Sequence, residues 1–203
     1  MSNPEAPPAD PDRAEREVRS LLATDEGRVV HSRAVADRAR ALGVGLPRPQ
    51  RAVLVAAAWL HDVGYAPALH RTGFHPLDGG RWVARTGWPA PVADLVAHHS
   101  GARFVAEARG LAAELEVFTF TESPLTDALT VADQTVGPDG RSVGLDDRMA
   151  DMLRRHGPDS PNARAHARRE PYLRAAAARV ARRLADLGVV DAVLHRGSPP
   201  PGR

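Results

Sequence analysis

The sequence predicts an all-α protein, folded as a single-domain helical bundle. Apolar residues recur at helical spacing in several segments, while the alternation typical of β-strands is almost absent. Hydrophobic residues make up 43% of the 203 residues but aromatic residues only 4%, so the core must consist mainly of Ala, Val and Leu. These residues favour helices. A chain of this length can bury one sizeable core, and one domain is therefore expected.

Short segments that contain Gly and Pro separate the expected helices, because these residues break helices. The breakers are GVGLPRP, GYAP, TGWPAP and VGPDGR. Pro171 should interrupt or kink the last helix, unless it lies in the first turn of a new one. The segment EVFTFTES (115–122) is the one brief stretch with strand-like alternation. In chain order, the helices are expected over 12–23, 27–42, 50–62, 76–86, 91–99, 103–113, 124–135, 145–155 and 161–187.

The two ends of the chain differ from this pattern. Residues 1–11 are rich in Pro, Asp and Ala, and residues 191–203 end in the Pro-rich stretch RGSPPPGR. Neither end can bury enough apolar surface to become ordered. We therefore expect disordered tails over 1–11 and 191–203 on either side of a helical domain over 12–190.

Composition also narrows the choice of compartment and partner. No apolar run approaches the roughly 20 residues that span a bilayer, and MSNPEAPPADPD lacks the basic and apolar regions of a signal peptide. We therefore expect a cytoplasmic protein without a membrane partner. All 27 basic residues are Arg, but the net charge is only +2, which argues against a broad nucleic-acid-binding surface.

The chain contains no cysteine. Disulfides, thiolate nucleophiles and zinc sites built from Cys are therefore excluded. Any metal must be bound by His and carboxylate side chains.

Two histidines in the first half of the chain lie on apolar helix faces. His31 shares a face with Val35, four residues further on, and His61 shares one with Ala57. Both should therefore point inward, with Asp62 at the end of the second of these helices. Buried alone, each of these side chains would be costly.

The same spacing places polar residues on later helices. His99 continues an apolar stripe through Val96, whereas His98 falls on its flank, and Asp133 lies four residues after Leu129.

A further histidine, His75, stands directly before Pro76. Proline is favoured at the first position of a helix, so His75 should lie at a helix start.

Each of these side chains alone has an ordinary structural explanation. An inward His usually bonds to a backbone carbonyl, and an inward Asp usually caps a helix or pairs with a cation. Four inward His and two inward Asp would each need a partner in one small core, however, and a divalent cation satisfies them together. Nitrogen and oxygen ligands point to iron, manganese, cobalt or magnesium before structural zinc, and imidazoles favour the transition metals.

The order of these residues resembles the HD-domain superfamily of metal-dependent phosphohydrolases, which has a lone His, a His-Asp pair and a distant Asp. They are His31 in VVHSRAVADRARALG, His61 and Asp62 in AAWLHDVGY, and Asp133 in ALTVADQT. The resemblance covers roughly residues 25–145. It implies an all-helical bundle in which His61 and Asp62 are catalytic.

A subset of the superfamily has two further His and holds two metals, and GFHPLDGG and VAHHSGAR resemble its additional elements. By this resemblance Asp62 would bridge the metals, with His98 as an extra ligand because some relatives use both members of a His-His pair. One metal would be bound by His31, His61 and Asp133, the other by His75 and His99. The implied cofactor is two divalent transition metals per chain, iron or manganese, with cobalt, magnesium or zinc as alternatives.

The resemblance implies hydrolysis of a phosphoester or phosphoanhydride by a metal-activated water. The substrate would be a nucleotide or another small phosphorylated compound. Arginines near the ligand segments are candidates for binding its phosphate, namely Arg71, Arg103 and Arg141. The sequence departs from the family pattern at two points. Tyr65 replaces a Lys that many HD hydrolases carry, and the Gly-Tyr-Pro signature that defines the HD-type phosphodiesterases of cyclic dinucleotides does not follow His99. Cleavage of cyclic dinucleotides is therefore not the first choice.

Two other functions use the same ligands. Some HD-fold proteins with four His and two Asp are mixed-valent diiron oxygenases, and a non-catalytic regulatory module could keep a metal for stability. The helices expected near 145–157 and 161–187 suit packing behind the site, or a surface for a homo-oligomer.

Overall fold

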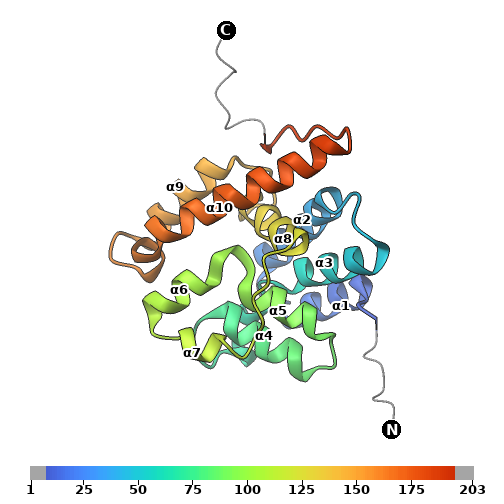
Figure 1. The fold of residues 1–203 in the computed structure, drawn as a ribbon. Coiled ribbons are helices and arrows are strands. Elements are labelled where there is room, and N and C mark those ends of the chain that lie inside the picture. The colour runs from blue at the N-terminus through green and yellow to red at the C-terminus, as the bar shows by residue number, and fades with distance from the viewer. Residues whose placement is uncertain (1–7, 195–203) are drawn as a thin grey trace.

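The structure, a computed structural model, describes residues 8–194 (Figure 1). Within this range the chain is all-α, and the single β-type contact is an isolated antiparallel bridge between Val136 and Ser142. This confirms the predicted single-domain helical bundle. The segment 115–122, which has strand-like alternation, contains no strand and follows a short helix as a loop. No helix in the described range is long and apolar enough to cross a bilayer.

The first three helices form one side of the bundle. They are α1 (Pro11–Leu21), α2 (Glu26–Leu42) and α3 (Arg48–Leu60). Asp10 and Asp25 cap the first two by accepting backbone N–H bonds, as short acidic side chains commonly do. Both α1 and α2 pack on α3, whose residues from Leu54 to Leu60 are all buried. The end of α3 is therefore enclosed, and the residues that follow it lie inside the protein.

The next helices carry the middle of the chain across the lower part of the bundle in Figure 1. They are α4 (His75–Arg85), α5 (Ala90–His98), α6 (Ala102–Arg109) and α7 (Ala112–Leu115). The expected single helix over 103–113 is in fact split into α6 and α7. Gly110 ends α6 with φ of +73°, a left-handed conformation that glycine adopts readily and that a continuing helix cannot contain.

A close approach links the end of α3 to the start of α4. The 3₁₀ turn η1 (Val63–Tyr65) packs against α4. A Cβ atom placed on Gly64 would lie 2.0 Å from the carbonyl oxygen of His75 and 2.7 Å from the amide nitrogen of Gly79. Only glycine therefore fits at this position, and the contact sets where His75 lies relative to the end of α3.

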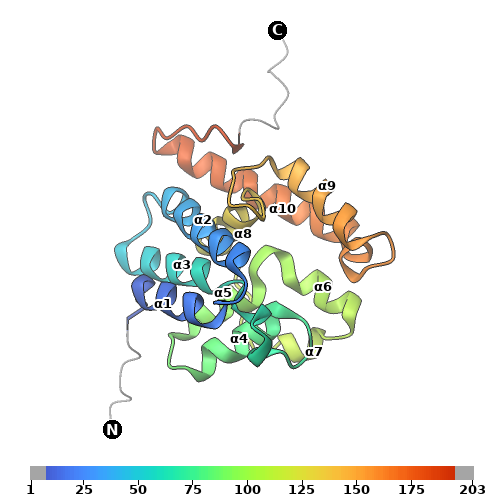
Figure 2. The ribbon, with the colours of Figure 1, turned by 180° about the vertical axis from the view of Figure 1, so that it is seen from behind.

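The last three helices are α8 (Pro124–Gln134), α9 (Leu145–His156) and α10 (Pro161–Asp186). Helix α8 contacts α2, α3, α5 and α10 and so lies at the centre of the bundle. Helices α9 and α10 lie along one edge, opposite α1 and α4, in both views (Figures 1 and 2).

Pro171 does not interrupt the last helix, contrary to the sequence-based expectation. It lies inside α10, which continues from Pro161 to Asp186. A proline inside a helix costs about 3 kcal/mol. The adjacent side chains of Tyr172 and Leu173 are buried, and burying each contributes roughly 1.5–3 kcal/mol, which offsets that cost.

Most of the two expected tails lies outside the described residues, namely 1–7 and 195–203. The parts that are described belong to the folded domain. Asp10 caps α1, and Oδ1 of Asp191 accepts a hydrogen bond from Nη2 of Arg38 in α2 at 2.8 Å. The ordered domain therefore extends beyond the expected 12–190 at both ends.

Candidate metal centre

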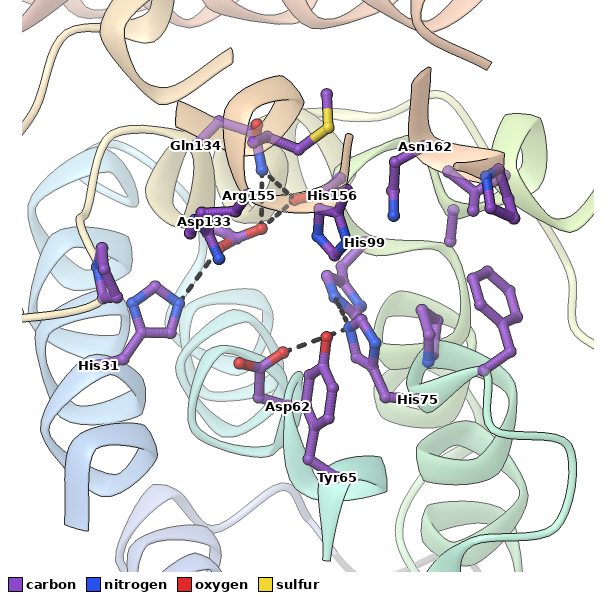
Figure 3. Close-up of a pocket in the computed structure, with 18 of the residues that line it drawn as sticks. His31, Asp62, Tyr65, His75, His99, Asp133, Gln134, Arg155, His156 and Asn162 are labelled. Carbon is purple, nitrogen blue, oxygen red and sulfur yellow. Dashed lines mark hydrogen bonds and ion pairs between the residues drawn. The ribbon is translucent and has the colours of Figure 1, made fainter. Parts of the chain in front are cut away.

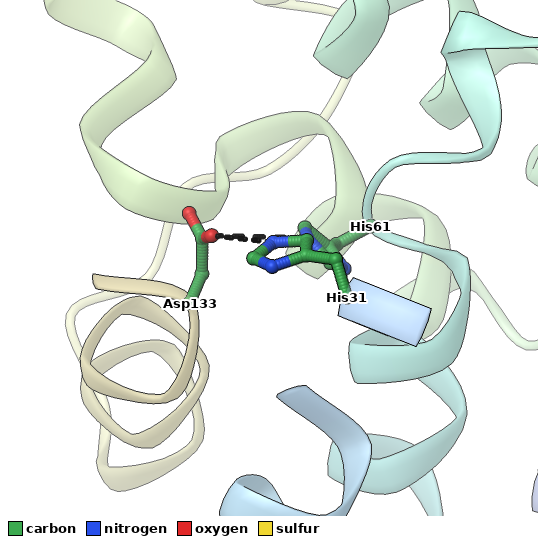
Figure 4. Close-up of side chains that lie close together, drawn as sticks. All are labelled: His31, His61 and Asp133. Atoms are coloured by element: carbon green, nitrogen blue, oxygen red, sulfur yellow. Dashed lines mark hydrogen bonds and ion pairs between the residues drawn. The ribbon is translucent and has the colours of Figure 1, made fainter. Parts of the chain in front are cut away.

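Three side chains from three parts of the bundle form a first group of candidate ligands (Figure 4). His31 lies on the buried face of α2, His61 directly follows α3, and Asp133 lies near the end of α8. The Nε2 atom of His31 is 3.2 Å from Oδ1 of Asp133, and Nε2 of His61 is 3.8 Å from the same oxygen. All three side chains are buried, as their apolar helix faces predict.

A second group, Asp62, His75 and His99, lies beside the first (Figure 3). The Nε2 atom of His75 is 3.3 Å from Oδ1 of Asp62 and 3.2 Å from Nε2 of His99. Asp62 and His99 are buried, whereas the His75 side chain is 22% exposed. Oδ1 of Asp62 also lies 3.6 Å from Nε2 of His61, so Asp62 is close to both groups.

Backbone carbonyls orient three of the four imidazole rings. In each of these rings Nδ1 donates to a backbone carbonyl oxygen. His31 donates to Gly137 at 2.9 Å, His61 to Ala58 at 2.8 Å and His99 to Val96 at 2.7 Å. Since Nδ1 carries the proton in each bond, Nε2 of the neutral ring carries a lone pair. The three rings therefore present lone pairs to one space, an arrangement typical of metal-binding imidazoles.

These lone pairs are poorly satisfied by the protein itself. Nε2 of His61 is buried and has no hydrogen-bond partner among the described residues. Nε2 of His31 lies 3.2 Å from Oδ1 of Asp133, a contact that either a proton or a cation between the two atoms satisfies. Four imidazole nitrogens and two carboxylates are a donor set suited to divalent transition metals. The residues present therefore fit such ions.

The protonation of the group suits the same role. Burial lowers the pKa of His61 to about 4 and that of His75 well below its usual value, so both rings are neutral near pH 7. Burial disfavours the charged forms of Asp62 and Asp133, but the neighbouring histidines outweigh it and lower the pKa of both carboxyl groups. Burial also disfavours charged His31, but its bond to Asp133 and the charge of Asp62 raise its pKa.

A family model for the HD domain matches residues 28–136, which is more than half of the chain and spans all six of these residues. The chain belongs to the HD-domain family. No curated protein and no solved structure matches it. The superfamily consists mostly of metal-dependent hydrolases, and the two groups of His and Asp residues in this chain could each bind a metal ion.

Within this HD domain, Asp133 is held by further polar contacts. The hydroxyl of Ser100 donates to its Oδ2, and Nε2 of Gln134 donates to the same oxygen at 2.9 Å. Ser100 has φ of +53°, a left-handed conformation that costs a non-glycine residue roughly 1–2 kcal/mol. Nε of Arg169 donates to the Ser100 carbonyl oxygen at 2.6 Å and helps to hold this conformation. The strained residue thus places its hydroxyl on a candidate ligand.

Arg28 and Tyr65 lie beside Asp62. The Arg28 guanidinium is 3.3 Å from the centre of the Tyr65 ring, and its Nη1 donates to Oδ2 of Asp62 at 3.0 Å. The Tyr65 ring stacks on His75 with 4.0 Å between ring centres. Burial and the charge of Asp62 raise the pKa of Tyr65 to about 12, so its hydroxyl stays protonated. Although Tyr65 replaces a lysine found in many relatives, Arg28 brings a cation to Asp62.

The ligand groups open into a pocket of about 610 Å³, which is large enough for a nucleotide-sized compound. One wall consists of the ligands and Tyr65. His156 and Asn162 lie across the pocket from Tyr65 and His75 (Figure 3). The metal centre therefore faces residues from α9 and α10, which lie outside the segment matched by the family model.

The structure does not bring His98 to this centre, and its prediction as an extra ligand is corrected here. Nε2 of His98 donates to the carbonyl oxygen of Phe118 at 3.0 Å, and its ring packs against Phe120. It borders a separate pocket of about 180 Å³. The backbone leaves the helix between His98 and His99, which turns the two rings in different directions.

The three arginines predicted to bind phosphate do not line the large pocket either. Arg71 donates to the carbonyl oxygen of His70, Arg103 lies over the Phe120 ring, and the side chain of Arg141 is 87% exposed. Their closeness in sequence to ligand residues did not bring their side chains to the site. All three follow turns whose direction the sequence pattern does not determine.

Other arginines that the sequence analysis missed do line the pocket, namely Arg28, Arg109, Arg148, Arg155 and Arg169. The position of Arg28 could have been predicted from the sequence, because it precedes His31 by three residues on the same helix and therefore lies on the same side of that helix. Arg148 and Arg155 share a face with Met152 at helical spacing, but that pattern fits a packing face equally well. Their direction depends on how α9 docks.

Proposed function

We propose that this HD domain is a phosphohydrolase that cleaves a phosphoester or phosphoanhydride of a nucleotide or another small phosphorylated substrate through a metal-activated water. One observation carries the proposal above all others: two groups of three ligands lie side by side and Asp62 is close to both. Paired metal sites of this kind are typical of phosphoryl-transfer enzymes. Membership of a family that consists mostly of metal-dependent hydrolases supports the same conclusion.

In this proposal His31, His61 and Asp133 would hold one divalent ion, His75 and His99 would hold a second, and Asp62, which is close to both groups, would be shared by them. The bound pair would lower the pKa of a coordinated water and stabilise negative charge on phosphoryl oxygens. Iron or manganese is the proposed metal, with cobalt, magnesium and zinc as alternatives for the same donors.

The protein's own residues would then bind and orient the phosphoryl group. Nη2 of Arg148 lies 3.5 Å from Oδ1 of Asp133, so its guanidinium is well placed to bind phosphoryl oxygens beside the ligands. Arg28 donates to Asp62 and holds that carboxylate in one orientation. The buried position of both ligand groups limits access of bulk water to one side of the site.

The test is the metal content of freshly purified protein, measured by elemental mass spectrometry, followed by an anaerobic assay of phosphate release. We expect close to two iron or manganese ions per chain and metal-dependent release of phosphate from nucleotides or other phosphate esters. Protein that holds its metals but releases phosphate from no ester or anhydride would contradict the proposal.

The same experiment separates the two alternative functions. Oxygen consumption by an iron-loaded protein, without anaerobic phosphate release, would indicate a mixed-valent diiron oxygenase. If Asp62→Asn unfolds the protein while the wild type turns over no substrate, a non-catalytic module stabilised by metal is the better description.

A further inference from the structure

A cluster of basic side chains lines the pocket next to the metal centre, beginning beside Asp133. We call it the basic wall, and it consists of Arg148, Arg155 and His156 of α9 and Arg169 of α10. Figure 3 labels Arg155 and His156 above the ligands of the second group. None of these four residues belongs to the segment matched by the family model, which ends at residue 136.

Arg169 is the most unusual member of the basic wall. It is only 7% exposed, and its Nε donates to the Ser100 carbonyl oxygen. Among the described residues, no carboxylate lies within 4.0 Å of it, and its two terminal nitrogens have no hydrogen-bond partner. A buried guanidinium without a counter-ion is costly. Since it lines the pocket, a ligand can reach these free donors.

Arg148 and Arg155 share one carboxylate. Asp151 lies 3.9 Å from Nη1 of Arg148 and 2.6 Å from Nε of Arg155, and it also pairs with Arg154 at 2.7 Å. In addition, Nε of Arg148 is buried and has no partner among the described residues. Arg148 also lies 3.5 Å from Oδ1 of Asp133, so two carboxylates face the guanidinium groups of Arg148, Arg154 and Arg155. With the buried Arg169 these are four cations against two anions, and positive charge remains in excess at the wall.

The remaining pocket arginines are already engaged. Arg28 pairs with Asp25 and Asp62, and Nη2 of Arg109 donates to the carbonyl oxygen of Thr72. The carbonyl bond leaves the charge of Arg109 in place, so the excess positive charge of the pocket lies mainly on α9 and α10, with Arg109 of α6 as a further contributor. Arg148 and Arg155 are seven residues apart on one helix face, which corresponds to about 10 Å along the helix axis. The wall thus begins beside Asp133 and continues away from the ligands.

We propose that the basic wall binds a second phosphoryl group of the substrate, so that the protein acts on compounds with two or more linked phosphoryl groups. This inference rests on the proposed function for the phosphoryl group at the metal centre. Arg148 would contact the group at the ligands, while Arg155, His156 and Arg169 would contact the next one. Guanidinium groups suit this role because their paired N–H donors match phosphate oxygens.

The test compares two ligands that differ in one phosphoryl group. Manganese-loaded protein is titrated by calorimetry with AMP and with α,β-methylene-ADP, whose phosphorus–carbon bridge resists hydrolysis. We expect the wild type to bind the diphosphate analogue at least about tenfold more tightly, since hydrogen bonds to charged groups contribute roughly 1.5–3 kcal/mol. Arg155→Gln should remove most of that difference and leave AMP affinity within about twofold, and Arg169→Gln should also remove most of the difference.

Arg154→Gln is the matched control. Arg154 neighbours Arg155 and pairs with the same aspartate, but it is 72% exposed and does not line the pocket. It should leave both affinities unchanged. Arg169 also supports Ser100, so if Arg169→Gln fails to fold, Arg155→Gln decides the question, because the Arg155 side chain is 45% exposed and the fold does not depend on it.

Equal affinity of the wild type for the two ligands would overturn the inference, as would an equal loss for both in Arg155→Gln. Phosphate release from simple monoesters is measured in parallel. If release occurs without discrimination between the ligands, only this inference fails. If discrimination occurs without any release, the second phosphoryl site stands and the proposed hydrolysis fails.

Discussion

The metal centre and the basic wall line the same pocket, but they are built differently. The centre comes from residues 31–133, and three of its imidazoles are locked by bonds to backbone carbonyls. The wall comes from α9 and α10 and consists of long side chains with few protein partners. The first is a fixed set of donors that a cation would satisfy, whereas the second is open to the pocket and suited to an anionic ligand.

This difference suggests a division of roles. The segment shared with the HD-domain family carries the groups for chemistry, and the C-terminal helices, which lie outside the matched segment, carry groups that would select the substrate. Variants in the two regions should therefore behave differently.

The first variant breaks the metal centre without changing the wall. Asp62→Asn keeps the size of the side chain but removes its negative charge, which lies close to His61 of the first group and to His75 of the second. We expect loss of at least one metal ion per chain and a loss of phosphate release of about 100-fold or more, because even indirect partners of metal ligands contribute 10- to 100-fold. Elemental analysis and the phosphate assay measure both. Full metal content with normal activity would remove Asp62 from the proposed centre.

The neighbouring histidines provide a matched pair. His99→Gln removes a candidate ligand, whereas His98→Gln removes only a bond to the Phe118 carbonyl oxygen. Metal affinity should fall at least about tenfold in the first and stay unchanged in the second, which should lose roughly 1 kcal/mol of stability. Metal titration and thermal unfolding distinguish them. Equal metal loss in both variants would show that this placement of His98 is wrong.

A third variant acts through packing alone. In Gly64→Ala the new methyl group would lie 2.0 Å from the His75 carbonyl oxygen, so the backbone must move. We expect about 1–3 kcal/mol of destabilisation, together with weaker metal binding in the second group because His75 is displaced.

Gly27→Ala is the control for this substitution. The nearest atom to a Cβ at Gly27 is 3.6 Å away, and a helical alanine is favoured over glycine. Denaturant unfolding should show this variant as neutral or slightly stabilised. If Gly64→Ala is equally neutral, η1 and α4 are not held as closely as described.

The smallest effect concerns how the C-terminal region is attached to the ligand helices. Arg38 of α2 pairs with Asp191, and although burial disfavours the charged carboxylate, the bond to Arg38 outweighs it and lowers the pKa of Asp191. A lowered pKa in the folded state means that the pair stabilises the protein above pH 4, and that this contribution is lost as the pH falls through the folded value.

Asp191→Asn should therefore reduce the free energy of unfolding by about 1 kcal/mol or less at pH 7, and this reduction should shrink as the pH falls through the folded pKa of Asp191. Unfolding curves of both proteins at several pH values measure this difference. A difference that grows as the pH falls would contradict the assigned direction of the pKa shift.

The sequence alone was sufficient for the fold class and for much of the candidate site. Helical spacing predicted the all-α bundle, and it placed His31, His61 and Asp133 on inward faces, where they are found. These are local properties, because the face of a helix follows from the spacing of its own apolar residues. Membership of the HD-domain family was predicted separately, from the resemblance of the order of His31, His61, Asp62 and Asp133 to that family, and the family model confirms it.

Local spacing was less reliable where the chain leaves a helix. Gly110 divides a predicted helix, and Pro171 is accommodated within α10 because its neighbours are buried. The different directions of His98 and His99 likewise follow from a backbone change between them.

What only the tertiary structure decided is which arginines meet the metal centre. Arg103 is four residues from His99 but lies outside the pocket, while Arg169 is separated from the ligands by a long stretch of sequence and lines it. The docking of α10 on α6 and α8 determines this, through contacts between residues far apart in the chain. A helical pattern states which face is buried. It does not state which neighbour covers that face, so the basic wall became visible only in three dimensions.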